Sequence, residues 1–149
     1  MWMQRLLPAV CLWFAATGVA LGDCWDKAAQ RYNIPVRVLY AVAKTESNLD
    51  PKAYEKGAGF ESIGLMQVNS FWFPKLKKFG IAREDLWNPC QNLMAGSWIL
   101  AQEIKRYGLN WVAIGAYNSG AYDERTRQAK LRQYVIYANT VYRHLPKLR

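Results

Sequence analysis

The first 22 residues constrain the rest of the chain most strongly, because they decide the compartment in which it folds. One arginine precedes an apolar stretch over residues 6–21, a pattern typical of a cleaved secretory signal peptide. A retained membrane anchor is the alternative, but Pro8 and Gly18 interrupt the stretch, which is short for a membrane span. We therefore expect a signal peptide at 1–22 and one exported domain at 23–149, with no stable membrane insertion after cleavage.

Export would also decide the chemistry of the cysteines, since disulfides persist in oxidising compartments. Removal of the signal peptide takes Cys11 away and leaves Cys24 and Cys90. A single pair of cysteines in an exported domain predicts one disulfide, Cys24–Cys90, worth about 4 kcal/mol in the chain-entropy model. Two buried free thiols are the alternative.

Composition excludes several classes of protein. With 149 residues, 52% of them hydrophobic and 21% charged, the chain fits one compact domain. The scarcity of histidine, with His144 alone, and of cysteine, with three residues, argues against a Ser-His-Asp triad and a His/Cys zinc site. We therefore expect no metal and no organic cofactor, and we expect His144 to be exposed. The net charge of +9 favours an anionic partner or a solvated basic surface.

Short segments with helical spacing of apolar residues follow one another along the mature chain. Residues 52–62 lack that spacing and predict a loop, which leads into a short β-like run over 63–68. The fold class is therefore mostly α, with a small irregular β element after the second helix. The predicted helices cover residues 23–32, 35–47, 75–79, 90–107 and 111–119 and a C-terminal segment. The predicted inner face of that last segment consists of Leu131, Tyr134, Val135, Ala138, Val141 and Leu145.

Helix packing does not explain Glu46. It follows Val42 by four positions and Leu39 by seven, so it lies on the face that turns inward. Lys44 is a poor partner for it, because residues two apart on a helix point in different directions. Glu46 is therefore either paired and structural, or desolvated so that its raised pKa keeps it a proton donor near neutral pH, as a general acid requires.

Two further runs combine small residues with polar side chains. In the run from Ser62 to Asn69, Gly64 lets the backbone approach a ligand and Gln67 offers a donor and an acceptor. In Ala116–Gly120, a Tyr-Asn pair closes a short helix. Taken alone, the first run is typical of a buried strand with polar edges, and the second of a helix C-terminal cap with a core tyrosine. Aromatic residues that suit either sugar stacking or the core are Trp72, Trp87, Trp98 and Tyr122.

Three motifs, taken in order, resemble the soluble lytic transglycosylase family, which has a lysozyme-like fold. They are Thr45-Glu46-Ser47, Gly64-Leu65-Met66-Gln67 and Ala116-Tyr117-Asn118-Ser119-Gly120. The resemblance covers roughly residues 24–122. Small size, the export signal and the cysteine positions further resemble the branch that accompanies type III and type IV secretion systems, pili and conjugation machines.

The resemblance implies a peptidoglycan substrate, cleaved at the β-1,4 bond from N-acetylmuramic acid to N-acetylglucosamine. Glu46 takes the place of the acid/base, which protonates the glycosidic oxygen and then accepts the proton of the muramic C6 hydroxyl as a 1,6-anhydro ring closes. Tyr117 matches a tyrosine that holds this glutamate or the substrate's acetamido group. The residues that match positions lining or supporting the sugar site are Ser47, Met66, Gln67, Asn69, Tyr117 and Asn118, and Ser62 is a further candidate substrate-binding residue.

The chain departs from the branch at one position. Relatives often carry Asp two residues before the Gly of the Gly-Leu-Met-Gln run, whereas here Ser62 stands there with Glu61 beside it. Glu61 is therefore a candidate second carboxylate, and a solvated loop side chain is the alternative. If Glu61 belongs to the site, Glu61→Gln lowers turnover and Glu46→Gln abolishes it.

We therefore expect a monomeric periplasmic lytic transglycosylase that opens the wall locally for a secretion, pilus or conjugation machine. A lysozyme-type hydrolase and a non-catalytic peptidoglycan-binding assembly factor are the alternatives. Export argues against a nucleic-acid partner.

Overall fold

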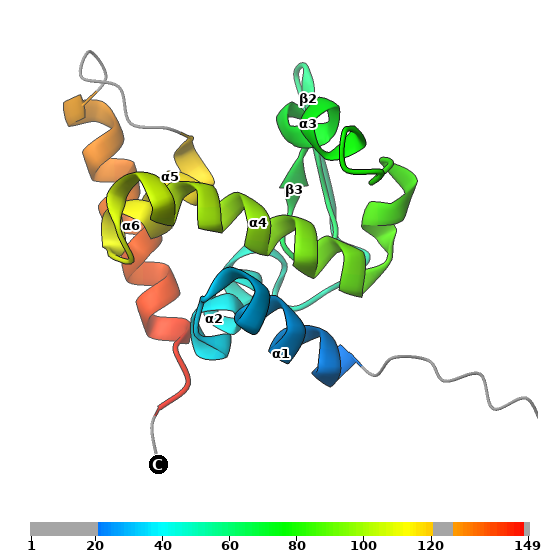
Figure 1. Cartoon of the computed structure of the whole chain (residues 1–149). Coiled ribbons are helices and arrows are strands. Elements are labelled where there is room, and N and C mark those ends of the chain that lie inside the picture. Colours follow the sequence, from blue (N-terminus) through cyan, green and yellow to red (C-terminus); the bar gives the residue numbers. More distant parts are fainter. Residues whose placement is uncertain (1–20, 121–126, 148–149) are drawn as a thin grey trace, which may run out of the picture.

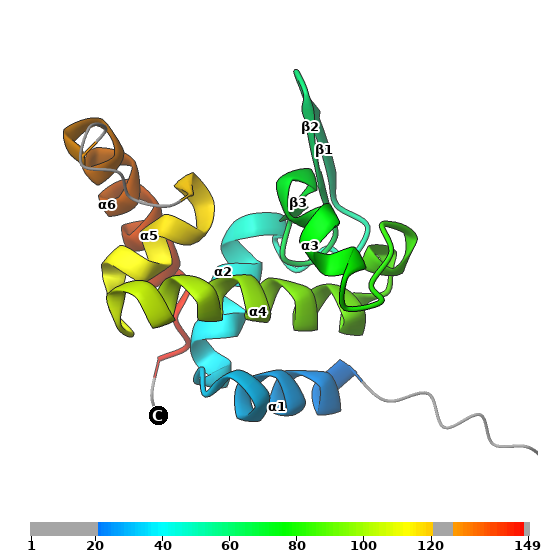
Figure 2. The same ribbon diagram turned by 45° about the horizontal axis from the view of Figure 1, so that its top comes forward.

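Helix α4 (Pro89–Tyr107) runs through the middle of the computed structural model, which describes residues 21–120 and 127–147 (Figure 1). Its start follows from the sequence: Pro89 suits the first turn, and the side chain of Asn88 accepts hydrogen bonds from the backbone of Cys90 and Gln91 at 2.9 and 3.1 Å. Gly108, with φ of 80°, ends it. The sheet lies near the first half of α4, and α5 and α6 pack near its second half (Figures 1 and 2).

The remaining helices confirm the mostly α prediction and place the core around α4. Buried residues of the core include Leu39, Val42, Ile63, Leu93 and Leu100. The helices are α1 (Leu21–Tyr32), α2 (Val36–Ser47), α3 (Phe73–Lys77), α5 (Trp111–Ser119) and α6 (Arg127–His144), with 3-10 turns η1 (Ser70–Trp72) and η2 (Glu84–Trp87). Among the described residues, no helix combines the length and apolarity needed to cross a membrane. Residues 1–20 of the expected signal peptide lie outside the described residues.

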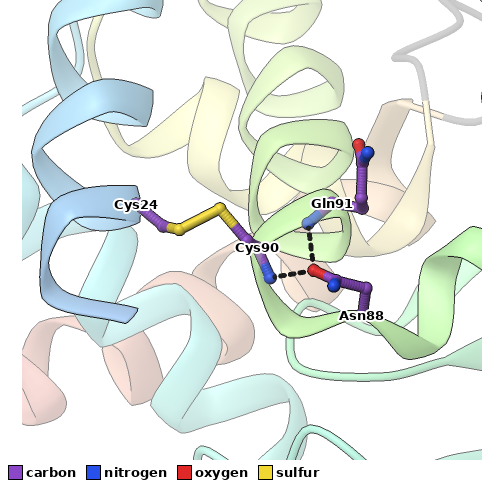
Figure 3. Close-up of a disulfide and its surroundings, with 4 residues drawn as sticks. All are labelled: Cys24, Asn88, Cys90 and Gln91. Atoms are coloured by element: carbon purple, nitrogen blue, oxygen red, sulfur yellow. Dashed lines mark hydrogen bonds between the residues drawn. A yellow bond between two sulfur atoms is a disulfide. The ribbon is translucent and has the colours of Figure 1, made fainter. Parts of the chain in front are cut away.

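The predicted disulfide joins α1 to the first turn of α4 (Figure 3). The Cα atoms of Cys24 and Cys90 are 5.6 Å apart, and Cys24 is fully buried. The bond therefore closes a 66-residue loop around the first two helices and the whole sheet.

The β element differs from the prediction. Strands β1 (Tyr54–Gly57), β2 (Phe60–Ile63) and β3 (Val68–Asn69) form an antiparallel sheet in the order β1-β2-β3. The predicted loop over 52–62 is therefore mainly a hairpin, and the predicted β-like run over 63–68 is mainly a turn. The hairpin was missed because β1 is mostly exposed and lacks apolar alternation. The apolar run over 63–68 is not a strand because Gly64, at φ 76°, and Gln67, at φ 47°, adopt the left-handed conformation, which interrupts a strand.

The inner face of α6 is rotated from the predicted one. Tyr134, Ala138 and Val141 are buried as predicted, but Leu131 and Val135 are 46% and 51% exposed. Tyr137, which was not on the predicted face, is buried. The face therefore follows the spacing of residues 134, 137, 138 and 141, which also fits a helix.

His144 is half-buried at the end of α6, so the prediction of an exposed histidine is wrong. Its Nδ1 lies 2.9 Å from Oγ1 of Thr45 on α2. Oγ1 of Thr45 also lies 2.8 Å from the carbonyl oxygen of Ala41, within hydrogen-bond distance. The contact between His144 and Thr45 joins the end of α6 to α2 one residue before Glu46.

Candidate active site

The three sequence motifs meet at a cleft of about 320 Å³. Helix α2 contributes Glu46, and α5 contributes Tyr117 and Asn118. The other residues lining the cleft are Glu55, Phe60, Ser62, Gln67, Asn69, Trp72 and Ile99. Among the described residues, no three His, Cys, Asp or Glu side chains gather as a metal-binding group.

Glu46 lies where α2 leaves the core. The helix ends at Ser47 because Asn48 adopts the left-handed conformation, with φ of 56°, and its N–H bonds the carbonyls of Ala43 and Lys44. Glu46 therefore occupies the last helical turn, one turn beyond the fully buried Val42. It is partly exposed, and that exposure is toward the cleft.

Desolvation is the main influence on the Glu46 carboxyl and raises its pKa from 4.5 to about 7. The Tyr137 hydroxyl donates a hydrogen bond to Oε1 of Glu46 and lowers this pKa. The negative charge of Glu55 raises it. A carboxyl with this pKa exchanges its proton readily near neutral pH, which suits a group that acts first as an acid and then as a base.

Two tyrosines stand close to this carboxyl. Burial raises the pKa of both Tyr117 and Tyr137 well above the ordinary value, and the charge of Glu46 adds to the effect. Both hydroxyls therefore remain proton donors over the pH range in which Glu46 titrates. The family resemblance predicted that Tyr117 holds either Glu46 or the substrate's acetamido group. In the structure the Tyr117 hydroxyl donates a hydrogen bond to the Met66 carbonyl at 2.7 Å. Tyr137 is the tyrosine bonded to Glu46.

Buried Asn92 shapes the turn between β2 and β3. Its Oδ1 accepts from the backbone N–H of Met66 at 2.7 Å, while its Nδ2 donates to the carbonyls of Ile63 at 2.7 Å and Leu86 at 2.9 Å. Gly64 passes close to this amide, since a Cβ there would lie 2.4 Å from Nδ2 of Asn92. Only glycine fits this position, because both the space and the φ of 76° exclude a side chain.

Two of the predicted site residues, Ser47 and Met66, do not line the cleft but pack next to it. Ser47 donates to the carbonyl of Leu65 at 2.7 Å, which ties the end of α2 to the turn. Met66 is fully buried and does not line the cleft. Gln67, next along the turn, does line it, and its Nε2 donates to the Ala53 and Gly64 carbonyls at 3.2 and 3.0 Å.

One face of the sheet forms part of the cleft. Cα pairing joins Glu55 to Ser62 and Ser62 to Asn69, so these residues form a row across β1, β2 and β3. The Asn69 amide donates to Oγ of Ser62 at 3.3 Å. All three line the cleft together with Phe60, two positions before Ser62 on the same strand.

Glu61 does not line the cleft. Successive side chains of a strand point to opposite faces, so Glu61 lies on the other face from Ser62. There it forms a two-pronged ion pair with Arg83, at 2.7 and 2.6 Å, and accepts a hydrogen bond from Tyr54 at 3.0 Å. The hydrogen bonds from Arg83 are the main reason that the pKa of Glu61 falls to about 2.

The candidate stacking residues are separated by the fold. Trp72 lines the cleft, and Trp98 packs edge-on against it with ring centres 5.6 Å apart. Trp87 packs against Tyr54, with ring centres 5.8 Å apart, outside the cleft. Tyr122 lies outside the described residues.

Residues 23–138 match the family model described as the transglycosylase SLT domain. The chain belongs to the SLT transglycosylase family. Membership agrees with the lysozyme-like, mostly α fold. It also supports a lytic transglycosylase-type role with peptidoglycan as the class of substrate.

Several relatives resemble this SLT domain over most of their length. Invasion protein IagB of Salmonella typhi is 37% identical over 141 residues, which cover 93% of this chain and 87% of the relative. Protein IpgF of Shigella flexneri is 37% identical over 123 residues, 81% of this chain and 78% of the relative. X polypeptide of Escherichia coli strain K12 is 37% identical over 145 residues, 95% and 83% of the two chains.

Proposed function

We propose that this SLT domain cleaves the β-1,4 bond between N-acetylmuramic acid and N-acetylglucosamine and leaves 1,6-anhydromuramic ends, with Glu46 as the acid/base. The observation that carries the proposal is the position of Glu46 in the cleft, with a pKa of about 7 and a hydrogen bond from Tyr137. Gln67, Tyr117 and the SLT match over residues 23–138 support it.

The reaction needs only one group that gives and then takes a proton. Protonated Glu46 donates to the glycosidic oxygen as the bond to C1 of muramic acid breaks. The resulting carboxylate accepts the proton of the C6 hydroxyl, whose oxygen attacks C1 and closes the anhydro ring. No water is consumed, and Glu46 ends protonated as it began. The Tyr137 hydroxyl stabilises the carboxylate between the two steps.

A lysozyme-type hydrolase is the second candidate, because Glu55 places another carboxylate in the cleft and many glycosidases use two. The two reactions differ by one molecule of water in their products. Hydrolysis leaves reducing ends, whereas the intramolecular route leaves anhydro ends.

The proposal includes export to the periplasm and local opening of the wall for a secretion, pilus or conjugation machine. Support for export comes from the apolar stretch over residues 6–21 and from the Cys24–Cys90 disulfide. Support for the role comes from the relatives that are named invasion protein IagB.

Mass spectrometry of a peptidoglycan digest tests this function. We expect the mature protein to release fragments with anhydro ends, and Glu46→Gln to release none while still binding purified peptidoglycan. Reducing ends would favour the hydrolase. Binding without release of fragments by either protein would favour a non-catalytic assembly factor.

A further inference from the structure

We propose that Glu55 is a second functional carboxylate of the cleft, whose charge stabilises the positive sugar that forms as the glycosidic bond breaks. This inference rests on the proposed function, because it concerns the same cleft and the same reaction. It assigns to β1 a role that the sequence suggested for Glu61 on β2.

The strand register supports this position for Glu55. Its Cα pairs with that of Ser62, and Ser62 pairs with Asn69, so the three residues cross the sheet in one row. Side chains in such a row share a face of the sheet. All three line the cleft that contains Glu46, and Glu55 is exposed on the cleft side.

The same alternation of side chains along the strand places Glu61 outside the cleft. Tyr54, Lys56 and Glu61 belong to the other face, where Arg83 forms an ion pair with Glu61. Among the described residues, Glu46 and Glu55 are the carboxylates that line this cleft. Glu55 forms no ion pair with another described residue, whereas Glu61 forms one with Arg83.

The chemistry needs a negative charge that stays in place. When the bond to C1 breaks, positive charge develops on the sugar, and a fixed carboxylate stabilises that charge more than it stabilises the neutral substrate. Glu55 forms no covalent bond and transfers no proton in this role. Glu46 alone exchanges the proton, and the closing C6 oxygen removes the positive charge.

Glu55 also acts on Glu46 through its charge. The titratable groups that influence the Glu46 carboxyl are Tyr137 on α6 and Glu55 on β1, and Tyr117 on α5 is close enough for the charge of Glu46 to raise its own pKa. Tyr137 lowers the pKa of Glu46, and Glu55 raises it. Loss of Tyr137 must therefore shift the pH dependence of turnover to higher pH, and loss of Glu55 must shift it to lower pH.

The first test compares Glu55→Gln with Glu84→Gln in the mature protein. Glu84 is a matched control, because its side chain is 76% exposed and lies outside the cleft. We expect Glu55→Gln to lower kcat/KM for peptidoglycan by about tenfold or more and to move the alkaline limb of the pH profile to lower pH. Glu84→Gln should match the wild type in both, and thermal unfolding should show that both variants are folded.

The second test moves the charge to the neighbouring strand. In the double variant Glu55→Gln/Ser62→Asp, the new carboxylate lies beside the position of the removed Glu55 carboxylate. It also lies next to the Asn69 amide, which donates a hydrogen bond to Ser62 in the wild type. We expect it to recover much of the lost kcat/KM. A folded double variant that remains as slow as Glu55→Gln would contradict an electrostatic role.

The proposed function and this inference fail in different ways. An active wild type, an inactive Glu46→Gln and a Glu55→Gln with unchanged kcat/KM and pH profile would overturn the role of Glu55 alone. A wild type that releases no fragments would overturn the proposed function and the inference with it.

Discussion

Replacement of Glu46 by Gln should stabilise the fold, and this stabilisation should grow as the pH rises from about 4.5 to about 7. The carboxyl has a pKa of about 7 in the folded protein against 4.5 for an exposed glutamate. One pKa unit corresponds to about 1.4 kcal/mol, so the difference amounts to about 3 kcal/mol. Gln keeps the shape of the side chain and its carbonyl still accepts from Tyr137, but it carries no charge to desolvate.

The sign follows from proton binding. Because the folded pKa is the higher one, the folded state holds the proton more tightly than the unfolded state. Below about pH 4.5 both states are protonated, and Glu46 costs no stability through ionisation. As the pH rises to about 7 and beyond, both states ionise and the full cost of about 3 kcal/mol appears. The wild type therefore loses stability relative to Glu46→Gln between these pH values.

Urea unfolding of both proteins with the disulfide intact, at about pH 4 and about pH 8, measures this cost. Other titrating groups are common to the two proteins and cancel in the difference. Glu84→Gln serves as the control for the loss of one exposed carboxylate, because its side chain is 76% exposed and lies outside the cleft. A difference between the wild type and Glu46→Gln that is equal at the two pH values would refute the raised pKa.

Three other variants test separate parts of the proposed structure and mechanism. Tyr137→Phe removes the hydrogen bond that lowers the pKa of Glu46. The alkaline limb of the pH profile of turnover should therefore move to higher pH by about one pH unit, and an unchanged limb would contradict this. Asn92→Ala leaves three backbone groups without their partner and should cost about 3 kcal/mol or more in urea unfolding, whereas a loss below about 1 kcal/mol would speak against its role. Cys24→Ser/Cys90→Ser should lose about 4 kcal/mol, and stability equal to the wild type would show that the bond contributes little.

The helices could be predicted from the sequence because each buries a stripe with a regular period. Leu39 and Val42 fix the inner face of α2, and that face already singled out Glu46. The sheet could not be predicted in the same way. Strand β1 consists of Tyr54, Glu55, Lys56 and Gly57, of which only Gly57 is partly buried, so hydrophobic alternation gives no signal there.

The site residues that the sequence did not predict, Glu55 and Tyr137, owe their positions to contacts that no local pattern indicates. Glu55 acquires its place through cross-strand pairing with Ser62, and register cannot be predicted from exposed polar strands. Tyr137 did carry a signal, since it lies three residues after Tyr134 and four before Val141 on the buried face of α6. Its contact with Glu46 spans 91 residues, which no local spacing indicates.

Digestion of purified peptidoglycan in water enriched in the heavy oxygen isotope tests most directly whether Glu46 drives cleavage by the substrate's own hydroxyl. The account predicts that fragments released by the wild type contain no label and weigh one water less than hydrolysed fragments, and that Glu46→Gln releases none. Heavy oxygen in the newly formed sugar ends would contradict it.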